Sequence, residues 1–419
     1  MNLEEELSMV IRGLRRLFSF PGYRLMEATF SADVVQVRLA RDRRYRLRCP
    51  HCGAKAWVDR REVRAARDLP FGPAMHVWIT YPASRFRCSA CGRRGWVTPA
   101  EIDARRRVTH RLLRWAAHLA RDLPLRKAAA LLEVGDTRLG RWDRAVLQEH
   151  LAPPDLDNLR VLMVDEKAIG RGHQYVTVVL DGDTGELLHL HEGRKKASLQ
   201  AFFDRLTEAQ KARIQAVCVD RLGAYVECIE EALPGAQIVY DKFHLLVNFH
   251  RIVDEVRRQE WNQARRTHAP QRAKLIKGQR YNLLRRAERN TPAQRRRLEE
   301  LLAMNEPLSK VYLLLEDLRA ALGERRAATA ERALRLWVQT ALDSGLRPVV
   351  HFARRLERGL HRIVNAVRFG LNNGRLEGFN NLIARIIHRA CGYQDQAYLF
   401  LKLRQASLPA EQQVPVLQK

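Results

Sequence analysis

Four of the seven cysteines form two Cys-x-x-Cys pairs, Cys49 with Cys52 and Cys88 with Cys91, and a glycine follows each pair. Four thiolates fill a closed tetrahedral Zn²⁺ site. The glycines relieve steric strain where backbone N–H groups turn toward the sulfurs. The spacing therefore predicts a structural Zn²⁺ rather than a catalytic one, because no ligand position stays open. Two unrelated thiol pairs or a redox site are the alternatives.

Two carboxylates come directly after short apolar segments that we expect to be strands. Asp165 follows 160–164, and Asp220 follows 214–219. Such positions lie at the carboxyl edge of a sheet, where functional sites are common. Taken alone, each residue could simply end a strand or cap a helix. On neighbouring strands, however, they would form a candidate Mg²⁺ or Mn²⁺ site, because hard cations bind oxygen ligands.

A two-metal centre needs a third carboxylate to hold ions about 4 Å apart. Glu377 is flanked by glycines at the start of a predicted helix, and Asn380 and Asn381 share its face. Ordinary capping of a helix N-terminus by an acid is the alternative. For Asp181 and Asp183, a role in forming a turn between two strands would be sufficient. The candidates for the third ligand are Glu166, Asp181, Asp183, Asp241 and Glu377.

The segment from about 125 to 147 has the pattern of a helix-turn-helix. Gly135 lies in the predicted turn, and Leu139 and Trp142 lie three residues apart on one face of the second helix. A basic stripe on the opposite face suits contacts with phosphates and bases. A plain helical hairpin with a solvated arginine face is the alternative. The stripe consists of Arg138, Arg141 and Arg144.

The surrounding pattern indicates several domains. Three strands joined by turns are followed by alternating helices and strands, which resembles the layout of ribonuclease-H-like α/β folds and would place the ends at Asp165 and Asp220 side by side. Helical, arginine-rich sequence follows. We expect an N-terminal region over 1–99 with a four-cysteine zinc ribbon at about 45–98, a helix-turn-helix DNA-binding domain over 100–152, a catalytic core from 153–249 and 346–406, an all-α insertion over 250–345 and a tail over 407–419.

Composition narrows the possible partners. The chain has 419 residues, with 74 Lys and Arg against 47 Asp and Glu, giving a net charge of +27. A polyanion such as nucleic acid is the first candidate partner, and an anionic membrane surface is the second. No apolar run approaches the roughly 20 residues of a membrane span, and no secretory signal is visible. The odd cysteine count also argues against a disulfide framework and for a reducing cytosol.

These motifs together resemble DDE transposases, specifically the insertion-sequence L-three family. The resemblance covers roughly 45–405 and includes the cysteine ribbon, Asp165 with Glu166, and Asp220. It continues through the Asp-Lys-Phe-His run at 241–244. Its most specific part is the Asn-Gly-x-x-Glu-Gly-x-Asn-Asn run around Glu377, followed by Arg-Ala-Cys-Gly-Tyr at 389–393.

The resemblance implies a metal-binding catalytic triad of Asp165, Asp220 and Glu377, with a weaker supporting role for Asp241 and His244. It also implies phosphate contacts beyond the helix-turn-helix, for which Arg385 and Arg389 are candidates. The expected protein binds double-stranded DNA, both the terminal inverted repeats of its element and target DNA. Strand cleavage and strand transfer would depend on Mg²⁺ or Mn²⁺.

We further expect a homodimer or higher oligomer on DNA, because an element has two ends, and a bacterial cytoplasmic, nucleoid-associated protein with no membrane. Two alternatives remain. A non-catalytic DNA-binding regulator would use only the ribbon and the helix-turn-helix. A host nuclease of ribonuclease-H-like fold would share the sheet and the metal ions, and the absence of strand-transfer products would distinguish it.

Overall fold

The structure is a computed structural model that describes residues 13, 16–72, 75–170, 174–219, 223–371 and 374–414. The chain divides into two compact units. Unit 1 comprises Met1–Ala152 and Ile386–Lys419, and unit 2 comprises Pro153–Arg385. Within the described ranges, no helix is both long and apolar enough to cross a membrane.

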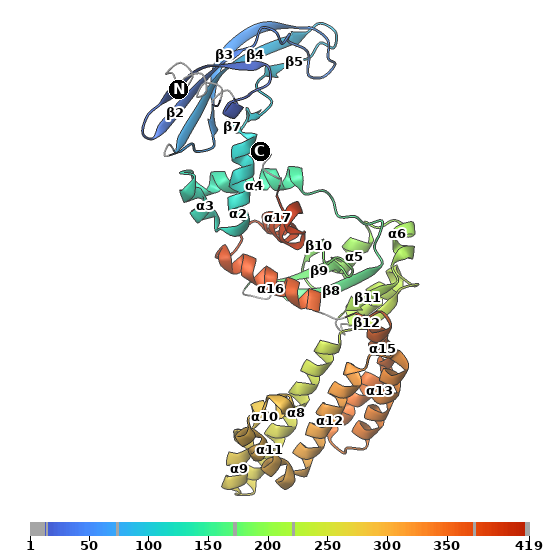
Figure 1. Cartoon of the computed structure of the whole chain (residues 1–419). Helices are drawn as coiled ribbons and strands as arrows, with labels where there is room; N and C mark the ends of the chain where they lie inside the picture. Colours follow the sequence, from blue (N-terminus) through green and yellow to red (C-terminus); the bar gives the residue numbers. More distant parts are fainter. Residues whose placement is uncertain are drawn as a thin grey trace. The chain divides into compact units, whose positions relative to one another are not determined.

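The N-terminal part of unit 1 is a seven-stranded sheet with the order β1-β2-β4-β3-β7-β6, and β5 pairs with β4. The antiparallel hairpin β3–β4 is its longest element, and the two cysteine pairs lie at the open end of that hairpin (Figure 1). Alternating apolar residues such as Val35, Val37, Val77 and Ile79 form the core of the sheet. The strands are β1 (Tyr23–Phe30), β2 (Val34–Arg41), β3 (Ala56–Asp68), β4 (His76–Cys88), β5 (Arg94–Val97), β6 (Ile102–Asp103) and β7 (Val108–Thr109).

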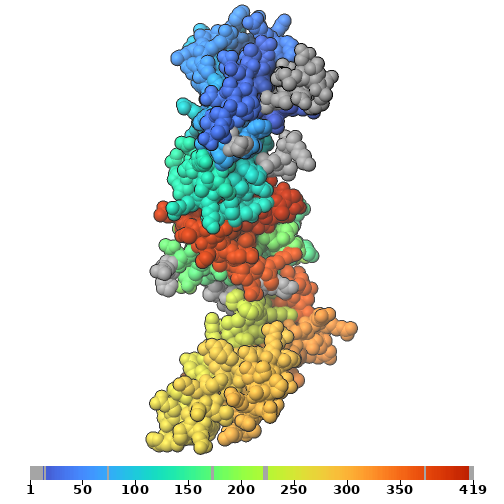
Figure 2. Space-filling view, turned by 60° about the vertical axis from the view of Figure 1, so that its left-hand side comes forward, coloured from blue at the N-terminus to red at the C-terminus, as the bar shows by residue number. Residues whose placement is uncertain are grey.

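Helices complete unit 1. The side chain of Thr109 caps α2 by accepting a hydrogen bond from the Leu112 amide. Leu139 and Trp142 pack inward on α4, as the helix-turn-helix pattern predicts. The space-filling view shows the last part of the chain, in red, directly against these helices (Figure 2). The helices are α2 (His110–Asp122), α3 (Leu125–Leu131), α4 (Asp136–His150), α17 (Gln396–Ser407) and the short 3-10 helix η2 (Ala410–Gln412).

Unit 2 contains a mixed five-stranded sheet with the order β10-β9-β8-β11-β12. Strand β9 pairs antiparallel with both β8 and β10, whereas β11 is parallel to both β8 and β12. The strands β8 and β11 are therefore neighbours, as their sequence order predicts. Helices α5 and α6 connect β10 to β11, and α7 connects β11 to β12. The elements are β8 (Val161–Ala168), β9 (Tyr175–Asp181), β10 (Leu187–Glu192), α5 (Lys196–Phe203), α6 (Glu208–Arg213), β11 (Ala216–Val219), α7 (Gly223–Ala232) and β12 (Gln237–Tyr240).

The remainder of unit 2 is helical. The 25-residue helix α8 starts directly after β12 and runs into the helical layer (Figure 1). One cluster of buried apolar residues includes members from Leu159 to Val364 in the sequence. It contains side chains of both the strands and the helices, so the sheet and the helices share a core. Helix α16 crosses the boundary between the units. The helical elements are α8 (Lys242–Arg266), α9 (Pro270–Lys277), α10 (Arg280–Leu284), η1 (Ala287–Arg289), α11 (Pro292–Met304), α12 (Glu306–Gly323), α13 (Ala327–Leu342), α14 (Arg347–Arg358), α15 (Leu360–Arg368) and α16 (Gly374–Arg389).

Candidate active site and nucleic-acid interface

The four predicted zinc ligands come together in unit 1. The Sγ atoms of Cys49 and Cys91 are 3.7 Å apart, those of Cys52 and Cys88 are 3.6 Å apart, and all four lie within 4.8 Å of one another. Sulfurs held about 2.3 Å from a tetrahedral Zn²⁺ would be about 3.8 Å apart. The spacing of the thiols therefore fits a zinc ion.

The two cysteine turns have the same backbone geometry. The amide of Gly53 donates to the carbonyl of Cys49 over 2.9 Å, and the amide of Gly92 donates to that of Cys88 over 3.0 Å. Both glycines have a φ of +71°, which a side chain would strain. The backbone N–H of Cys91 lowers the pKa of the Cys88 thiol to about 7. The turn thus stabilises a thiolate, the form that binds metal.

Asp165 lies where the burial of β8 changes. Val161 to Val164 are fully buried, whereas Asp165 is half-buried. Parallel pairing between β8 and β11 reaches Val164, which is paired with Val219. The strand does not end at Asp165 as predicted, because antiparallel pairing with β9 continues it to Ala168. Asp220, the predicted neighbour of Asp165, lies outside the described residues.

A direct side-chain contact links Asp165 to the helix that carries Glu377. Asn380 on α16 donates from Nδ2 to Oδ2 of Asp165 over 2.6 Å, and Oδ1 of Asp165 accepts the backbone N–H of Glu166 over 2.8 Å. Glu377 precedes Asn380 by three residues and is exposed in the first turn of α16. Residues three apart share a helix face. The structure therefore brings the face of Glu377 to the strand of Asp165.

A second contact anchors the start of α16. The guanidinium of Arg375 donates to the carbonyl of Gly182 in the β9–β10 turn. That turn is itself ordered by Asp181, which accepts the amide of Asp183, and by an ion pair between Asp183 and Arg160 at 2.9 Å. Asp181 and Asp183 therefore have turn-forming roles, and a role for Glu377 as the third acid stays a prediction.

Asp241 and His244 act on each other. Asp241 is the N-cap of α8, where its carboxylate accepts the amides of Phe243 over 2.8 Å and His244 over 3.3 Å. The His244 ring also contacts that carboxylate. Asp241 is only 5% exposed. Capping accounts for the position of this acid, and a catalytic role for either residue stays a prediction.

Sequence reasoning missed a buried hydroxyl pair beside these acids. The hydroxyls of Tyr225 on α7 and Thr177 on β9 are 2.6 Å apart. Burial, together with the charges of Glu166 and Asp165, raises the pKa of Tyr225 to about 12, and the hydrogen bond from Thr177 opposes this shift. Tyr225 therefore stays protonated near the carboxylates. The only sequence signal was its place in the motif after Asp220.

The predicted DNA-contacting arginines differ in their surroundings. Arg138 and Arg141 are exposed on α4. Arg144, one turn later, is ion-paired with Asp395, so its charge is partly neutralised within unit 1. Arg385 is exposed on α16, and Arg389 is half-buried beside the loop that precedes α17. Of these five residues, Arg138, Arg141 and Arg385 are exposed and therefore the most available to a phosphate.

Comparisons with known proteins agree with this arrangement. The model of a family described as "Transposase", from the ISL3 group, matches residues 162–403. The helix-turn-helix domain of transposase family ISL3 matches 98–147, and the zinc-finger of transposase IS204/IS1001/IS1096/IS1165 matches 46–91. These three matches follow one another along the chain with no overlap.

Two relatives are similar over long stretches. The transposase for insertion sequence element IS1001 of Bordetella parapertussis is 36% identical over 363 residues, which cover 85% of this chain and 88% of the relative. The transposase for insertion sequence element IS1557 of Mycobacterium tuberculosis is 30% identical over 266 residues, covering 59% of this chain and 60% of the relative. The resemblance stated from the motifs is thereby confirmed, and the chain belongs to the ISL3 family of DDE-type DNA transposases.

Proposed function

We propose that this transposase cleaves DNA at the ends of its insertion sequence and joins those ends to target DNA, with Asp165, Asp220 and Glu377 as the ligands of two Mg²⁺ or Mn²⁺ ions. The observation that carries the assignment is the 2.6 Å hydrogen bond from Asn380 to Asp165. It brings a helix more than two hundred residues away in the sequence onto the catalytic strand.

The strand order supports a ribonuclease-H-like core. Three antiparallel strands are followed by two parallel strands, and β8 and β11 lie side by side. Val219 is paired with Val164, and in the sequence these two residues are followed by Asp220 and Asp165. The parallel register favours a shared site for these two acids at the carboxyl edge of the sheet.

The residues at this edge suit a hydrated cation. Asp165 and Glu377 offer hard oxygen ligands. Oδ1 of Asn380 is buried and accepts no hydrogen bond from any described residue. Because an unsatisfied buried acceptor costs roughly 1–3 kcal/mol, a water bound to a cation beside Asp165 would relieve it. Two bound ions would lower the pKa of an attacking water and stabilise the leaving oxygen.

The chain's own residues would then position the reaction. Asn380 holds the Asp165 carboxylate in one rotamer, and Arg375 fixes the first turn of α16 against the β9–β10 turn. Tyr225 remains a neutral hydroxyl close to the acids. The four-cysteine ribbon would hold a structural Zn²⁺, and the helix-turn-helix would bind the terminal inverted repeats. We further propose action as a dimer or larger assembly, since an element has two ends, in the bacterial cytoplasm.

A cellular excision assay tests the catalytic assignment. The substrate is a marker flanked by the inverted repeats that border this gene. Wild type is compared with Glu377→Gln and with Glu299→Gln, an exposed acid on α11 that serves as the matched control. We expect excision by wild type and the control and loss of excision in Glu377→Gln. Equal excision by all three would remove Glu377 from the site and make Asp241 the next candidate.

A further inference from the structure

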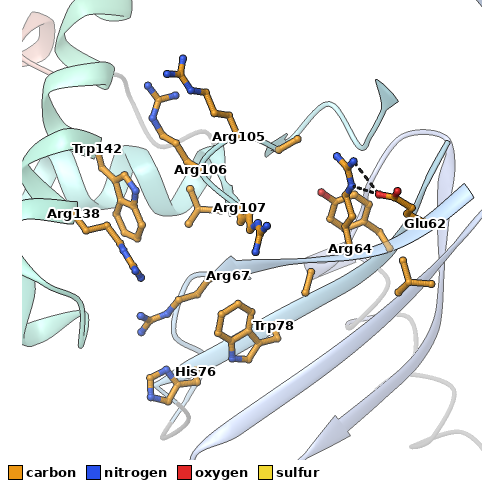
Figure 3. Close-up of a pocket in the computed structure, with 15 residues that line it drawn as sticks. Glu62, Arg64, Arg67, His76, Trp78, Arg105, Arg106, Arg107, Arg138 and Trp142 are labelled. Atoms are coloured by element: carbon orange, nitrogen blue, oxygen red, sulfur yellow. Dashed lines mark hydrogen bonds and ion pairs between the residues drawn. The ribbon is translucent and has the colours of Figure 1, made fainter. Parts of the chain in front are cut away.

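A cleft of about 870 Å³ lies within unit 1, between the β3–β4 hairpin, the segment before β7 and helix α4 (Figure 3). It is separate from the acids of unit 2. Six arginines line it against one acid, Glu62. The arginines are Arg64, Arg67, Arg105, Arg106, Arg107 and Arg138.

Most of the cleft's positive charge is not neutralised by the protein. Glu62 is already ion-paired with Arg64 at 3.1 Å, and Arg106 is paired with Asp103. By contrast, Arg105, Arg107 and Arg138 are exposed, and none of the three forms an ion pair with a described carboxylate. Figure 3 shows the Arg107 and Arg138 side chains reaching from opposite sides into the space above Arg67. Such an arrangement attracts a polyanion.

Side-chain contacts between the sheet and the helix-turn-helix fix the walls of the cleft. Arg67 of β3 is 8% exposed and donates to the carbonyls of Leu132 over 2.6 Å and Glu133 over 3.1 Å, in the turn between α3 and α4. His76 of β4 pairs with the Glu133 carboxylate at 2.9 Å. The sheet therefore holds the turn of the helix-turn-helix at two points, and the cleft exists before any ligand binds.

Two further observations indicate that the cleft can bind an anion. Nε of Arg67 is buried and has no hydrogen-bond partner among the described residues. Burial lowers the pKa of Arg67; Glu133 opposes this, and the like charge of Arg138 lowers the pKa further. An anion between the two guanidiniums would relieve their repulsion. Trp78, 39% exposed beside Arg67, adds an apolar surface suited to a sugar ring.

We propose that this cleft binds the sugar-phosphate backbone of duplex DNA, so that the sheet and the helix-turn-helix form one composite DNA-binding surface. The inference rests on the proposed function, which supplies the DNA, and it adds where the backbone is held. The helix α4 would then approach base edges while Arg107 and Arg138 contact phosphates on either side of the cleft. Phosphate contacts set position and affinity but carry no sequence information.

Fluorescence anisotropy of the zinc-loaded full chain tests this surface. Two labelled duplexes of equal length carry either the terminal repeat or a scrambled sequence, and Kd is measured from low to moderate salt. Arg107→Ala and Arg138→Ala are compared with Arg43→Ala, an exposed arginine outside the cleft with no ion pair among the described residues. Each variant removes one positive charge, and thermal melting checks that each is folded.

We expect Arg107→Ala and Arg138→Ala to raise Kd about tenfold on both duplexes and to reduce the slope of log Kd against log salt by about 0.9 for each lost phosphate contact. Arg43→Ala should change neither. Equal effects of all three variants would contradict the proposal that the cleft binds the DNA backbone. Unchanged duplex binding with weakened binding to phosphatidylserine vesicles would overturn it in favour of a membrane surface. Wild-type binding without preference for the repeat would instead contradict the proposed repeat recognition and leave the cleft standing.

Discussion

The two units hold their functional side chains by different means. In unit 2, the strands β9 and β11 and the first half of β8 are almost wholly buried and mostly apolar, and one continuous cluster packs them against helices. The acids lie at the edge of that core. In unit 1, the apolar clusters are separate and small, and buried polar contacts join them. Arg67 and the cysteine cluster are examples.

The most deeply buried of these polar contacts joins helix α4 to helix α17. Lys402 of α17 is 3% exposed and lies 3.1 Å from Asp143, which is fully buried. The hydroxyl of Tyr398 donates to the same carboxylate, and Lys402 also donates to the carbonyl of Ala120 over 3.1 Å. A large apolar core tolerates exposed functional groups at its edge, whereas a small one depends on specific contacts whose loss is costly.

The largest expected difference between the units follows removal of metal. Structural zinc sites contribute about 10–16 kcal/mol of binding free energy, which small ribbons use to fold. A chelator should therefore expose the amides of β3 and β4 near the cysteines, while β8 and β11 keep their protection. Hydrogen exchange followed by mass spectrometry measures both regions in one sample. Unchanged protection in β3 and β4 would show that the ribbon does not depend on zinc.

The buried ion pair gives the next largest effect. Lys402→Met leaves the Asp143 charge buried without its cation and should destabilise unit 1 by about 3–5 kcal/mol. Urea unfolding followed by exchange in α4 measures it. Replacing the whole network by Asp143→Leu, Tyr398→Phe and Lys402→Met should recover most of that loss, because no buried charge remains. A triple variant as unstable as the single one would contradict this account.

Unit 2 has a polar group that burial keeps neutral. His189 in β10 is 9% exposed, and burial lowers its pKa to about 4, an effect that Arg205 and His191 increase and the hydrogen bond to Ser198 opposes. The unfolded chain binds a proton near pH 6.5 and the folded chain does not. Stability should therefore be complete above about pH 6.5 and fall by up to about 3 kcal/mol as the pH drops toward 4.

The sign of that pH effect is tested with His189→Gln, which keeps a donor for the Ser198 carbonyl but does not titrate. Urea unfolding at pH 4.5 and 7.5, followed in β10, should show a smaller pH difference than in wild type. His361→Gln, an exposed residue of α15, is the control and should behave as wild type. The same pH difference in all three proteins would exclude His189 as its source.

The smallest effect concerns the hydrogen bond between Asn380 and Asp165 at the proposed active site. Asn380→Ala removes the hydrogen bond to Asp165 without removing an acid. Groups that orient metal ligands are worth about 10–100-fold in affinity or activity. We expect excision to fall by that factor and to recover in part when Mn²⁺ is raised, since the lost function is positioning. An Asn380→Ala protein as inactive as Glu377→Gln at every metal concentration would argue for a direct catalytic role.

Local patterns in the sequence predicted the elements that depend on local chemistry. The cysteine turns, the inward face of α4 and the strand order of unit 2 were all predictable, because spacing and alternation specify them. The edge strand β1 was missed because its side chains, including Met26 and Phe30, are about half exposed and give no buried face. Alternating residues at 56–63 and 76–81 predict shorter strands than β3 (Ala56–Asp68) and β4 (His76–Cys88), because the remaining residues lack that alternation and are ordered by pairing across the hairpin.

Contacts between distant residues were not predictable from one sequence. Asn380 and Asp165 are 215 positions apart, and Lys402 and Asp143 are 259 apart. Nothing in the neighbouring residues marks either pair. Glu377 was predicted as a site residue because glycines flank it and a family motif contains it, whereas the contact of its helix with the Asp165 strand, through Asn380, needed the structure.

Helix α17 determines when unit 1 can be completed. The residues of unit 2 up to Arg385 are synthesised before Lys402 and Tyr398, which Asp143 needs as partners. The sheet of unit 2 is therefore synthesised completely before the last residues of unit 1. A product of a gene truncated within α16 would leave Asp143 buried and unpaired. Such a fragment would reach neither full stability nor a competent DNA surface, so partial copies of the element would encode defective proteins.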